Sequence, residues 1–516
     1  MKKKLFTIWL IAVLMMTGCT AAPSQTITSQ TKTTTTITIT STTSAAVPVS
    51  TKTQKPKPTV TTKPSPTVPV TTQTFSGDVF PGTVILGRPE TDSITLSLLT
   101  AIDADFYVQY GQSSGKYDKQ TATTALQKDQ PLQYKIAGLS NATKYYYRVC
   151  YRTTANNAFS AADEASFSTQ KAVGDSFVFT VDADPHFDNN ANPAKVGLTF
   201  QNILSEHPDF DIDLGDTFMT EKMPGLTAAQ IGNVYVDRRT YFSVFGSSVP
   251  LFLANGNHDG EQGWLLNGTA NNEAVLAATM RNLYYPNPSP DIFYSGDSKS
   301  EPFVGLRQNY YSWTWGDALF IVLDPYWYTT TGKTAGWDWT LGKTQYDWLR
   351  TTLENSKAKY KFVFAHQLEG GFDMGTTGNG RGGAEAAMMY EWGGQNADGS
   401  WGFDTYRPGW GKPIQQLLVD NKVTAFFHGH DHLYAYQQLN GVVYQDCPQP
   451  GAINGKNSGA EYGYKDGVIL SSSGHIRVTV SDSSVKVDYV KTYMPGEASA
   501  GHQNGEVAYS YTIKAK

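Results

Sequence analysis

Residues 177–216 read FVFTVDADPHFDNNANPAKVGLTFQNILSEHPDFDIDLGD, and this stretch decides the fold. The apolar run at 177–181 is typical of a buried strand, 193–206 has the spacing of a helix, and 210–214 is a second apolar strand. The same alternation of strand and helix continues to residue 253. Strands that alternate with helices pair in parallel through right-handed crossovers, so the sequence predicts an α/β fold.

Polar clusters follow the apolar strands, at the points where the strands are expected to end. Five of them stand in chain order: Asp184-Pro185-His186, Gly215-Asp216, Gly256-Asn257-His258-Asp259, Ala365-His366 and His428-Gly429-His430-Asp431-His432. Ligand sites of open α/β sheets lie at the carboxyl ends of the strands. Carboxylate oxygen, amide oxygen and imidazole nitrogen bind Zn, Fe or Mn. The clusters together could hold two divalent ions roughly 3.5–4 Å apart.

The motifs D-x-H, G-D, G-N-H-D, H and G-H-x-H occur here in the order that is characteristic of the calcineurin-like metallophosphoesterase superfamily. The chain resembles that superfamily over about residues 174–495. The resemblance implies a two-sheet β-sandwich core flanked by helices, with metal ions at the strand ends. It also implies a hydrolase that acts on phosphoric ester bonds.

The resemblance further implies a ligand set, carried over position by position. One ion would be held by Asp184, His186, Asp216 and His432. The second would be held by Asp216, Asn257, His366 and His430, so that the carboxylate of Asp216 bridges the two ions. His258 would sit beside the leaving group as the general acid, and Asp259 resembles the residue that orients it.

One departure from the pattern of purple acid phosphatases concerns the metals. Those enzymes carry a tyrosine three residues after the bridging aspartate, and this chain has Met219 there. Two divalent metal ions (Mn, Zn or Fe) are therefore expected rather than an iron(III) centre. The expected reaction is hydrolysis of phosphate mono- or diesters by attack of a metal-bound hydroxide, which needs no nucleophilic side chain.

Residues 76–171 alternate between short strands and breaks rich in glycine and serine. The stretch 138–149 resembles a strand of a fibronectin type III domain, with Tyr145 as the tyrosine of the corner motif. The resemblance to the N-terminal domain of purple acid phosphatases implies an all-β, fibronectin III-like sandwich. It would precede a metallophosphoesterase domain at 174–516, whose late strands, such as 476–480, are expected to complete the second sheet.

The first 75 residues are predicted to be a targeting signal followed by a disordered tether. A basic start, an apolar run and Met16-Thr17-Gly18-Cys19 resemble the signal of bacterial lipoproteins, so 1–19 is interpreted as a signal peptide and Cys19 as the lipidation site. An ordinary signal peptide with an incidental cysteine is the alternative. Residues 20–75 include 21 Thr and no acidic residue, which predicts a disordered tether. The protein is expected to be a cell-surface lipoprotein or to be secreted.

Charge limits the choice of partner. Residues 1–75 hold eight of the 41 basic residues and none of the 46 acidic ones, which leaves a net charge of -13 for the rest. An acidic body repels long polyanions, so no dedicated nucleic-acid binding is expected. A small phosphorylated substrate is expected, because bound metal ions set the local potential, and the lipid anchor is the only expected membrane contact. A nucleotidase or nuclease, or a non-catalytic surface-binding protein, is the alternative.

Two long segments that follow ligand motifs, 260–307 and 369–412, are expected to decide specificity, because long loops in compact domains are usually functional or disordered. In the second, Arg381 stands between two glycines and is a candidate clamp for a substrate phosphate. An arginine with a structural role in a turn is the alternative.

Overall fold

The computed structural model describes residues 79–153, 155, 158–331, 336–368, 381–453, 459–498 and 501–515. The predicted signal peptide, Cys19, the predicted tether and residues 369–380 of the second insertion lie outside this part of the chain. Residues 74–516 group into one compact unit. No helix among the described residues is both long and apolar enough to cross a membrane.

Residues 82–168, here called the N-terminal sandwich, consist of strands and turns. One sheet has the order β1-β2-β6, with β1 Gly82–Gly87, β2 Ser93–Thr100 and β6 Leu132–Ala137. The other has the order β4-β3-β7-β8, with β5 beside β3 and β9 beside β7. Its strands are β3 Ala104–Gly111, β4 Lys119–Gln120, β5 Thr124–Leu126, β7 Lys144–Thr153, β8 Ser160–Ala161 and β9 Ala165–Ser168.

The two sheets of the N-terminal sandwich share one apolar core, which includes Leu96 from β2 and Val108 from β3. Two facing sheets with one core between them are a β-sandwich, which confirms the predicted all-β architecture. The hydroxyl of Tyr145 accepts a hydrogen bond from the Ser140 amide at 2.8 Å, which is the contact of a tyrosine corner.

The first sheet of the following core has the order β12-β11-β10-β23-β24-β25. The strands β10 Phe177–Asp182, β11 Phe210–Asp213 and β12 Leu251–Leu253 pair in parallel, as predicted, and are linked by α1 Pro193–Glu206 and α2 Ala228–Gly246. The strand β23 Gly474–Val480 pairs antiparallel with β10, and β24 Ser484–Lys491 and β25 Val507–Lys514 continue the sheet, each antiparallel to the strand before it. The expectation that these late strands complete the second sheet is wrong, because an alternating pattern does not specify a strand's partner.

The second sheet has the order β13-β16-β17-β18-β19-β21-β20-β22. Its strands are β13 Ser295–Gly296, β16 Tyr311–Trp315, β17 Ala318–Val322, β18 Tyr360–Phe364, β19 Ala425–His428, β20 Leu433–Leu439, β21 Val442–Asp446 and β22 Val468–Ser471. The remaining α-helices and strands are α3 Glu273–Tyr284, α4 Gly342–Asn355, α5 Tyr390–Gly393, α6 Phe403–Tyr406, α7 Ile414–Asp420, β14 Ser300–Glu301 and β15 Gly305–Leu306. Short 3-10 turns lie at η1 Thr220–Lys222, η2 Gly263–Leu265, η3 Gly336–Asp338, η4 Ala386–Met388 and η5 Ala460–Tyr462.

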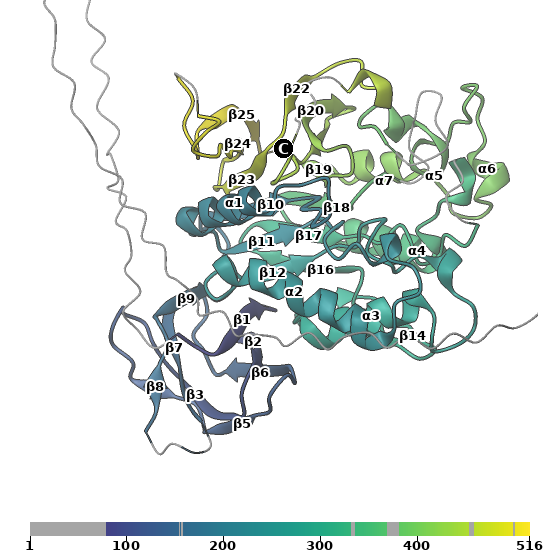
Figure 1. Ribbon diagram of the computed structural model, residues 1–516. Coiled ribbons are helices and arrows are strands. Elements are labelled where there is room, and N and C mark those ends of the chain that lie inside the picture. Colours follow the sequence, from purple (N-terminus) through teal and green to yellow (C-terminus); the bar gives the residue numbers. More distant parts are fainter. Residues whose placement is uncertain are drawn as a thin grey trace, which may run out of the picture. The chain divides into compact units, whose positions relative to one another are not determined.

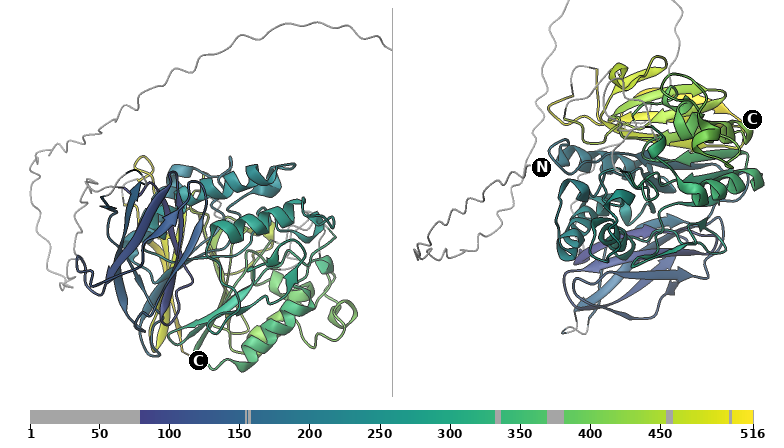
Figure 2. Two further views of the ribbon diagram at one scale, coloured as in Figure 1. Left: turned by 90° about the horizontal axis from the view of Figure 1, so that it is seen from below. Right: turned by 90° about the vertical axis from the view of Figure 1, so that its right-hand side faces the viewer.

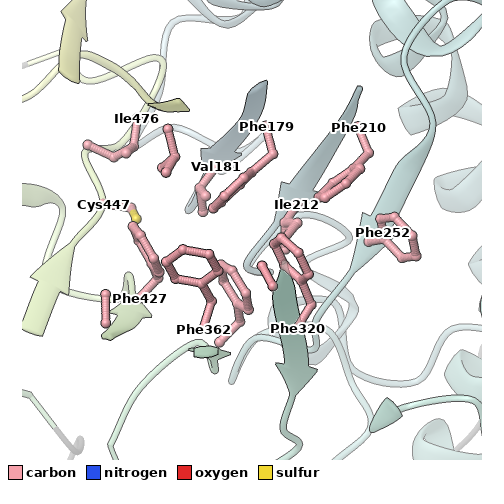
Figure 3. Close-up of a cluster of buried hydrophobic side chains, with 14 of the residues drawn as sticks. Phe179, Val181, Phe210, Ile212, Phe252, Phe320, Phe362, Phe427, Cys447 and Ile476 are labelled. Carbon is pink, nitrogen blue, oxygen red and sulfur yellow. The ribbon is translucent and has the colours of Figure 1, made fainter. Parts of the chain in front are cut away.

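Aromatic side chains fill the space between the two sheets (Figure 3). Phe179 of β10 stacks on Phe210 of β11 at 5.7 Å between ring centroids and meets the ring of Phe320 of β17 edge-on at 5.1 Å. Burial of each such side chain stabilises the fold by about 1.5–3 kcal/mol relative to exposure. This core holds the two sheets face to face.

Helices cover the outer faces of both sheets, as the views in Figure 1 and Figure 2 show. Phe200 of α1 and Phe242 of α2 share a core with Leu251 of the first sheet. Leu349 of α4 and Leu417 of α7 share another with the second sheet. The structure thus confirms the two-sheet core flanked by helices.

The N-terminal sandwich contacts this core through a buried arginine of α2. Arg239 is fully buried and donates hydrogen bonds to the hydroxyl of Thr83 at 3.0 Å and to the hydroxyl and carbonyl oxygens of Ser97, both at 2.9 Å. It also donates to the carbonyl oxygen of Tyr284 at the end of α3. One guanidinium therefore connects β1, β2, α2 and α3.

Candidate metal centre

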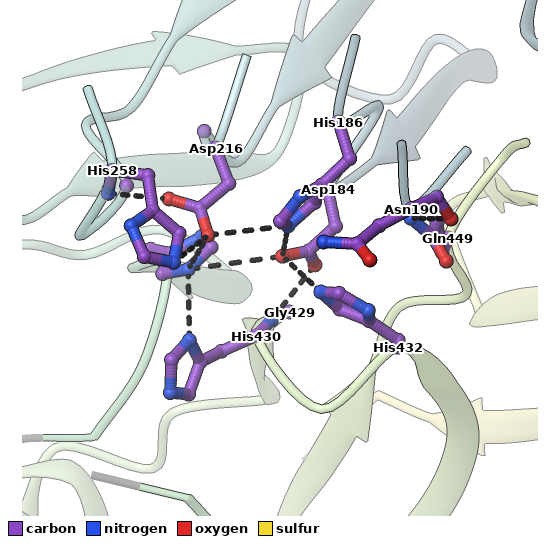
Figure 4. A network of polar contacts seen from close by, with 12 residues as sticks. Asp184, His186, Asn190, Asp216, His258, Gly429, His430, His432 and Gln449 are labelled. Carbon is purple, nitrogen blue, oxygen red and sulfur yellow. Dashed lines mark hydrogen bonds and ion pairs between the residues drawn. The ribbon is translucent and has the colours of Figure 1, made fainter. Parts of the chain in front are cut away.

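The predicted ligands come from the carboxyl ends of strands in both sheets (Figure 4). They follow β10, β11 and β12 in the first sheet and β18 and β19 in the second: Asp184, His186, Asp216, Asn257, His366, His430 and His432. The loop from β10 to α1 is fixed at its far end by Asn192, whose side chain caps α1 by accepting from the Ala194 amide at 3.0 Å. The structure brings together donors that lie up to 248 positions apart in the chain.

Five of these residues have a left-handed backbone conformation, which residues with a side chain seldom adopt. The angle φ is 60° at Asp184, 44° at His186, 57° at Asp216, 74° at His430 and 57° at His432. Such conformations cost roughly 1–2 kcal/mol each and persist where the surroundings impose them. Here the Asp184 amide donates to the Gly215 carbonyl oxygen at 2.9 Å, and the His430 amide donates to the Asp184 carboxylate at 2.8 Å.

The first cluster consists of Asp184, His186 and His432. Asp184 Oδ1 lies 3.3 Å from His432 Nε2 and 3.7 Å from His186 Nε2. Asp184 and His186 are buried, whereas the side chain of His432 keeps 26% of its surface exposed. This cluster therefore has one open side, at His432.

The second cluster consists of Asp216, His366 and His430, with Asn257 beside them. His366 Nδ1 lies 3.0 Å from the carbonyl oxygen of Leu214, to which it donates. His366 Nε2 then faces Asn257 Oδ1 at 3.0 Å and His430 Nδ1 at 3.2 Å. A proton on His366 Nε2 can form a good hydrogen bond to only one of these two atoms. A cation can be bound by all three donors, which are His366 Nε2, Asn257 Oδ1 and His430 Nδ1.

The carboxylate of Asp216 lies between the two clusters. Its Oδ2 is 3.4 Å from His186 Nε2 on one side and 3.4 Å from His366 Nε2 on the other. This is the position that a bridging ligand occupies, between the two groups of donors (Figure 4).

Charges within the centre shift the pKa values of its members. Burial by itself lowers the pKa of His186, but Asp184, Asp188 and Asp216 outweigh it and raise the pKa to about 11. Burial likewise lowers the pKa of His366, and Asp216 with Asp184 raises it to about 9. Burial raises the pKa of Asp184 and of Asp216, yet the neighbouring histidines hold both well below the usual value.

The donor atoms fit divalent ions. Within the described part of the chain, three of them are buried and have no partner in hydrogen-bond geometry: Asp184 Oδ1, Asp216 Oδ2 and Nε2 of His186. A buried polar atom without a partner costs about 1–3 kcal/mol. Carboxylate and imidazole donors that converge in this way match the ligand chemistry of Zn, Fe and Mn.

His258 lies at the edge of the centre and is not buried among the ligands. Its side chain is 19% exposed, its amide donates to Asp216 Oδ1 at 2.8 Å, and its Nε2 lies 4.0 Å from Asp216 Oδ2. Its Nδ1 lies 2.8 Å from Oε2 of Glu221 in η1. The ring is thus held through Nδ1, with Nε2 beside the metal ligands.

The expectation that Asp259 orients His258 is wrong. The Asp259 carboxylate accepts hydrogen bonds from backbone amides of the neighbouring loops, at 2.9 Å from Asp216, 2.9 Å from Thr217, 2.7 Å from Phe218 and 2.8 Å from Gly256. Asp259 therefore holds the loops together, and Glu221 contacts the histidine instead. The only sequence signal for Glu221 was an acidic residue soon after the Asp216 motif.

Arg381 lies beside the same centre. Its guanidinium stacks on the ring of Tyr462 at 4.5 Å, and the amide of Gly382 donates to Asp431 Oδ2 at 2.9 Å. Because Asp431 stands between His430 and His432, this bond fastens Arg381 to the loop that carries both ligands. A role of Arg381 toward substrate stays a prediction.

Two facing sheets with paired carboxylate and histidine clusters at their strand ends define a metal-dependent hydrolase. A family model described as calcineurin-like phosphoesterase matches residues 177–434, half of the chain. The chain belongs to this family, and it is a hydrolase that acts on phosphoester bonds. The family implies the dinuclear metal centre that the two clusters form.

Solved structures share the fold. A structure described as PhoD has a TM-score of 0.61 and 15% sequence identity, over 86% of this chain and 91% of that chain. The purple acid phosphatase PPD1 from yellow lupin (Lupinus luteus) seeds has a TM-score of 0.55 and 16% identity, over 85% of this chain and 75% of that chain. A comparison with curated proteins found no match.

Proposed function

We propose that the protein hydrolyses phosphate mono- or diesters outside the cytoplasm, with His258 as general acid at a two-metal centre. The observation that carries the proposal is the position of Asp216, whose Oδ2 lies 3.4 Å from a histidine nitrogen of each cluster. One carboxylate between two groups of donors suits two cations that act on the same phosphate.

The residues divide between the two ions as the clusters do. Asp184, His186 and His432 would hold one ion, and Asn257, His366 and His430 the other, with Asp216 shared. When bound, the two ions neutralise the charge of the phosphate and lower the pKa of a coordinated water.

His258 supplies the proton for the departing alcohol. Glu221 holds Nδ1 at 2.8 Å, so the ring cannot turn freely and Nε2 stays on the side of Asp216. A residue that donates a proton must reach the leaving oxygen, and the partial exposure of this ring leaves it accessible to substrate. Glu221 acts through the histidine and is a positioning residue.

The extracytoplasmic location rests on the sequence of the first 75 residues. A basic start, an apolar run and a lipobox-like Met16–Cys19 support export and acylation of Cys19. A net charge of -13 beyond the tether supports small phosphate esters as substrates rather than long polyanions.

The test is hydrolysis of a panel of phosphate mono- and diesters by protein reconstituted with Mn, Zn or Fe. We expect turnover by the wild type and a loss of at least about a hundredfold in Asp216→Asn. Metal-loaded wild-type protein that turns over no ester in the panel would refute the proposal.

A further inference from the structure

A pocket of about 490 Å³ opens beside His432, on the exposed side of the first cluster. Its volume falls within the range of about 300–1,000 Å³ that is usual for small-molecule sites. The lining residues on which the argument rests are Asn190, Arg381, Gln449, Ile453 and Tyr462. The described residues thus provide room for an organic group next to the metal ligands.

One wall of the pocket is fastened to the ligand loop through Ser472. Its hydroxyl accepts a hydrogen bond from the backbone amide of Gln449 at 3.0 Å and donates one to the His432 carbonyl oxygen at 2.9 Å. The bond from the Gly382 amide to Asp431 fixes Arg381 to the same loop. Both walls therefore keep their positions relative to His432.

The segment that carries Asn190, whose carbonyl oxygen lies 3.5 Å from Gln449 Nε2, is fastened to His186, another residue of the first cluster. The Asn190 amide donates to Asp188 Oδ1 at 2.8 Å, and the same oxygen lies 3.6 Å from His186 Nδ1. A pocket whose walls bond to residues at His186 and His432 is organised before a ligand enters, which lowers the cost of ordering on binding.

The lining suits a group that carries hydroxyls. Gln449, which is 3% exposed, and Asn190 line the pocket with side-chain amides. Gln449 Nε2 donates to the Asn190 carbonyl oxygen at 3.5 Å and Asn190 Nδ2 to Asp188 Oδ2 at 3.4 Å, and each amide group has a second N–H and an oxygen that a hydroxyl can use. The guanidinium of Arg381 lies over the flat ring of Tyr462, and Ile453 adds an apolar surface that is 53% exposed. Amides that bond hydroxyls beside a flat and an apolar surface are suited to a sugar ring.

The pocket lies away from His258. Figure 4 shows His258 at one end of the polar network and His432, Asn190 and Gln449 at the other, with His186 between them. The ring of His186 is 5.9 Å from that of His258 and 4.5 Å from that of His432. The alcohol that leaves with a proton from His258 must lie next to His258. A group bound in the pocket, at the other end of the network, is therefore not the leaving group but a substituent that stays on phosphorus.

We propose, on the basis of the proposed function, that the substrate is a phosphodiester whose retained alcohol is a sugar-bearing group bound in this pocket. Water supplies the oxygen that bonds to phosphorus, and the bond from phosphorus to the other alcohol breaks. That alcohol leaves with a proton from His258. The product is a monoester of the retained alcohol, because a monoester substrate has no substituent to place in the pocket.

The test keeps the leaving group constant and changes only the retained group. The probes are methyl 4-nitrophenyl phosphate and thymidine 5′-(4-nitrophenyl phosphate), with 4-nitrophenyl phosphate as the monoester. We expect kcat/KM for the thymidine diester to exceed that for the methyl diester by about tenfold or more. Gln449→Leu and Arg381→Met should each reduce this ratio to about 3 or less, whereas Gln438→Leu, at an exposed position of β20, should preserve it.

Equal kcat/KM values for the two diesters, or preference for the monoester, would overturn the pocket assignment and leave the proposed function intact. A second measurement does not need turnover. In metal-loaded His258→Asn, thymidine 5′-phosphate should bind about tenfold more tightly than methyl phosphate, and adding Gln449→Leu should remove the difference. Equal binding of thymidine 5′-phosphate and methyl phosphate also contradicts the pocket assignment. If thymidine 5′-phosphate binds more tightly but the wild type hydrolyses no ester, only the proposed function is contradicted.

Discussion

His258 Nδ1 lies 2.8 Å from Glu221 Oε2, and this contact joins the loop after β12 to the turn η1 that follows the Asp216 loop. A carboxylate on one ring nitrogen fixes the orientation of a histidine and the face that its other nitrogen presents. The ligand Asn257 stands directly before His258, so the backbone of the histidine is fixed by the same loop.

Substitution of His258 by Asn should separate catalysis from metal binding. The ring is not among the clustered ligands, so two metal ions should remain bound. If it supplies the proton as proposed, alkyl phosphates should react at least about a hundredfold more slowly. Nitrophenyl esters should lose less, since nitrophenolate leaves without a proton. Elemental analysis and kinetics on both ester types check this, and equal losses would contradict the role as general acid.

Glu221→Gln should act through the same proton transfer. The amide retains the size of the side chain but holds the ring less firmly, so alkyl phosphates should react about tenfold more slowly and nitrophenyl esters should change little. The exposed Glu354→Gln on α4 serves as the matched control and should match the wild type. A uniform loss on all esters would indicate a structural role for Glu221.

Asp216→Asn and Asn257→Ala should differ in metal content. Asp216 lies between both clusters, and Asn257 Oδ1 lies 3.0 Å from His366 Nε2 of the second cluster. We expect Asp216→Asn to weaken the binding of both metal ions and Asn257→Ala to leave about one ion bound per chain. Elemental analysis after dialysis measures this, and two ions in Asp216→Asn would rule out the bridge.

Metal binding should release protons. The pKa of His186 is raised to about 11 and that of His366 to about 9, so both rings are charged at neutral pH and each must lose a proton to bind an ion. We expect about two protons per chain at pH 7, and an apparent affinity that rises with pH. Calorimetry in two buffers of different ionisation enthalpy counts the protons, and a count of zero would contradict the charged state of these rings.

Cys19→Ala should move the protein from the membrane fraction to the soluble fraction of its native host. The prediction rests on the lipobox-like Met16–Cys19, in which the cysteine is the acylated residue. Fractionation with immunodetection checks it. A wild-type protein that is already fully soluble would favour the ordinary signal peptide.

The strands, and the presence of the predicted ligands at their ends, could be predicted from sequence because the signals are local. An apolar run such as 177–181 marks a buried strand, and the ligands follow such runs within a few residues. The contact between Glu221 and His258 could not be predicted, because the two residues are 37 positions apart and their approach depends on how the loop after Asp216 turns. Met219 in that loop has φ of 60°, a conformation that its residue type does not predict.

The interpretation of Asp259 failed for a related reason. An acidic residue next to a catalytic histidine has two possible uses, and sequence does not distinguish a bond to the ring from bonds to nearby amides. The structure shows five backbone donors on this carboxylate, and a buried carboxylate binds whichever donors surround it.

The buried Arg239 affects how the chain can be divided. If the N-terminal sandwich were removed, the guanidinium would lose its acceptors on Thr83 and Ser97, and the apolar side chains that share a core with Ile85 of β1, such as Phe245 of α2, would be exposed to water. Exposing such side chains costs about 1.5–3 kcal/mol each, a large share of the stability of an ordinary protein. Loss or exchange of the sandwich on its own would therefore destabilise the phosphoesterase core, so we expect the two to be inherited as one piece.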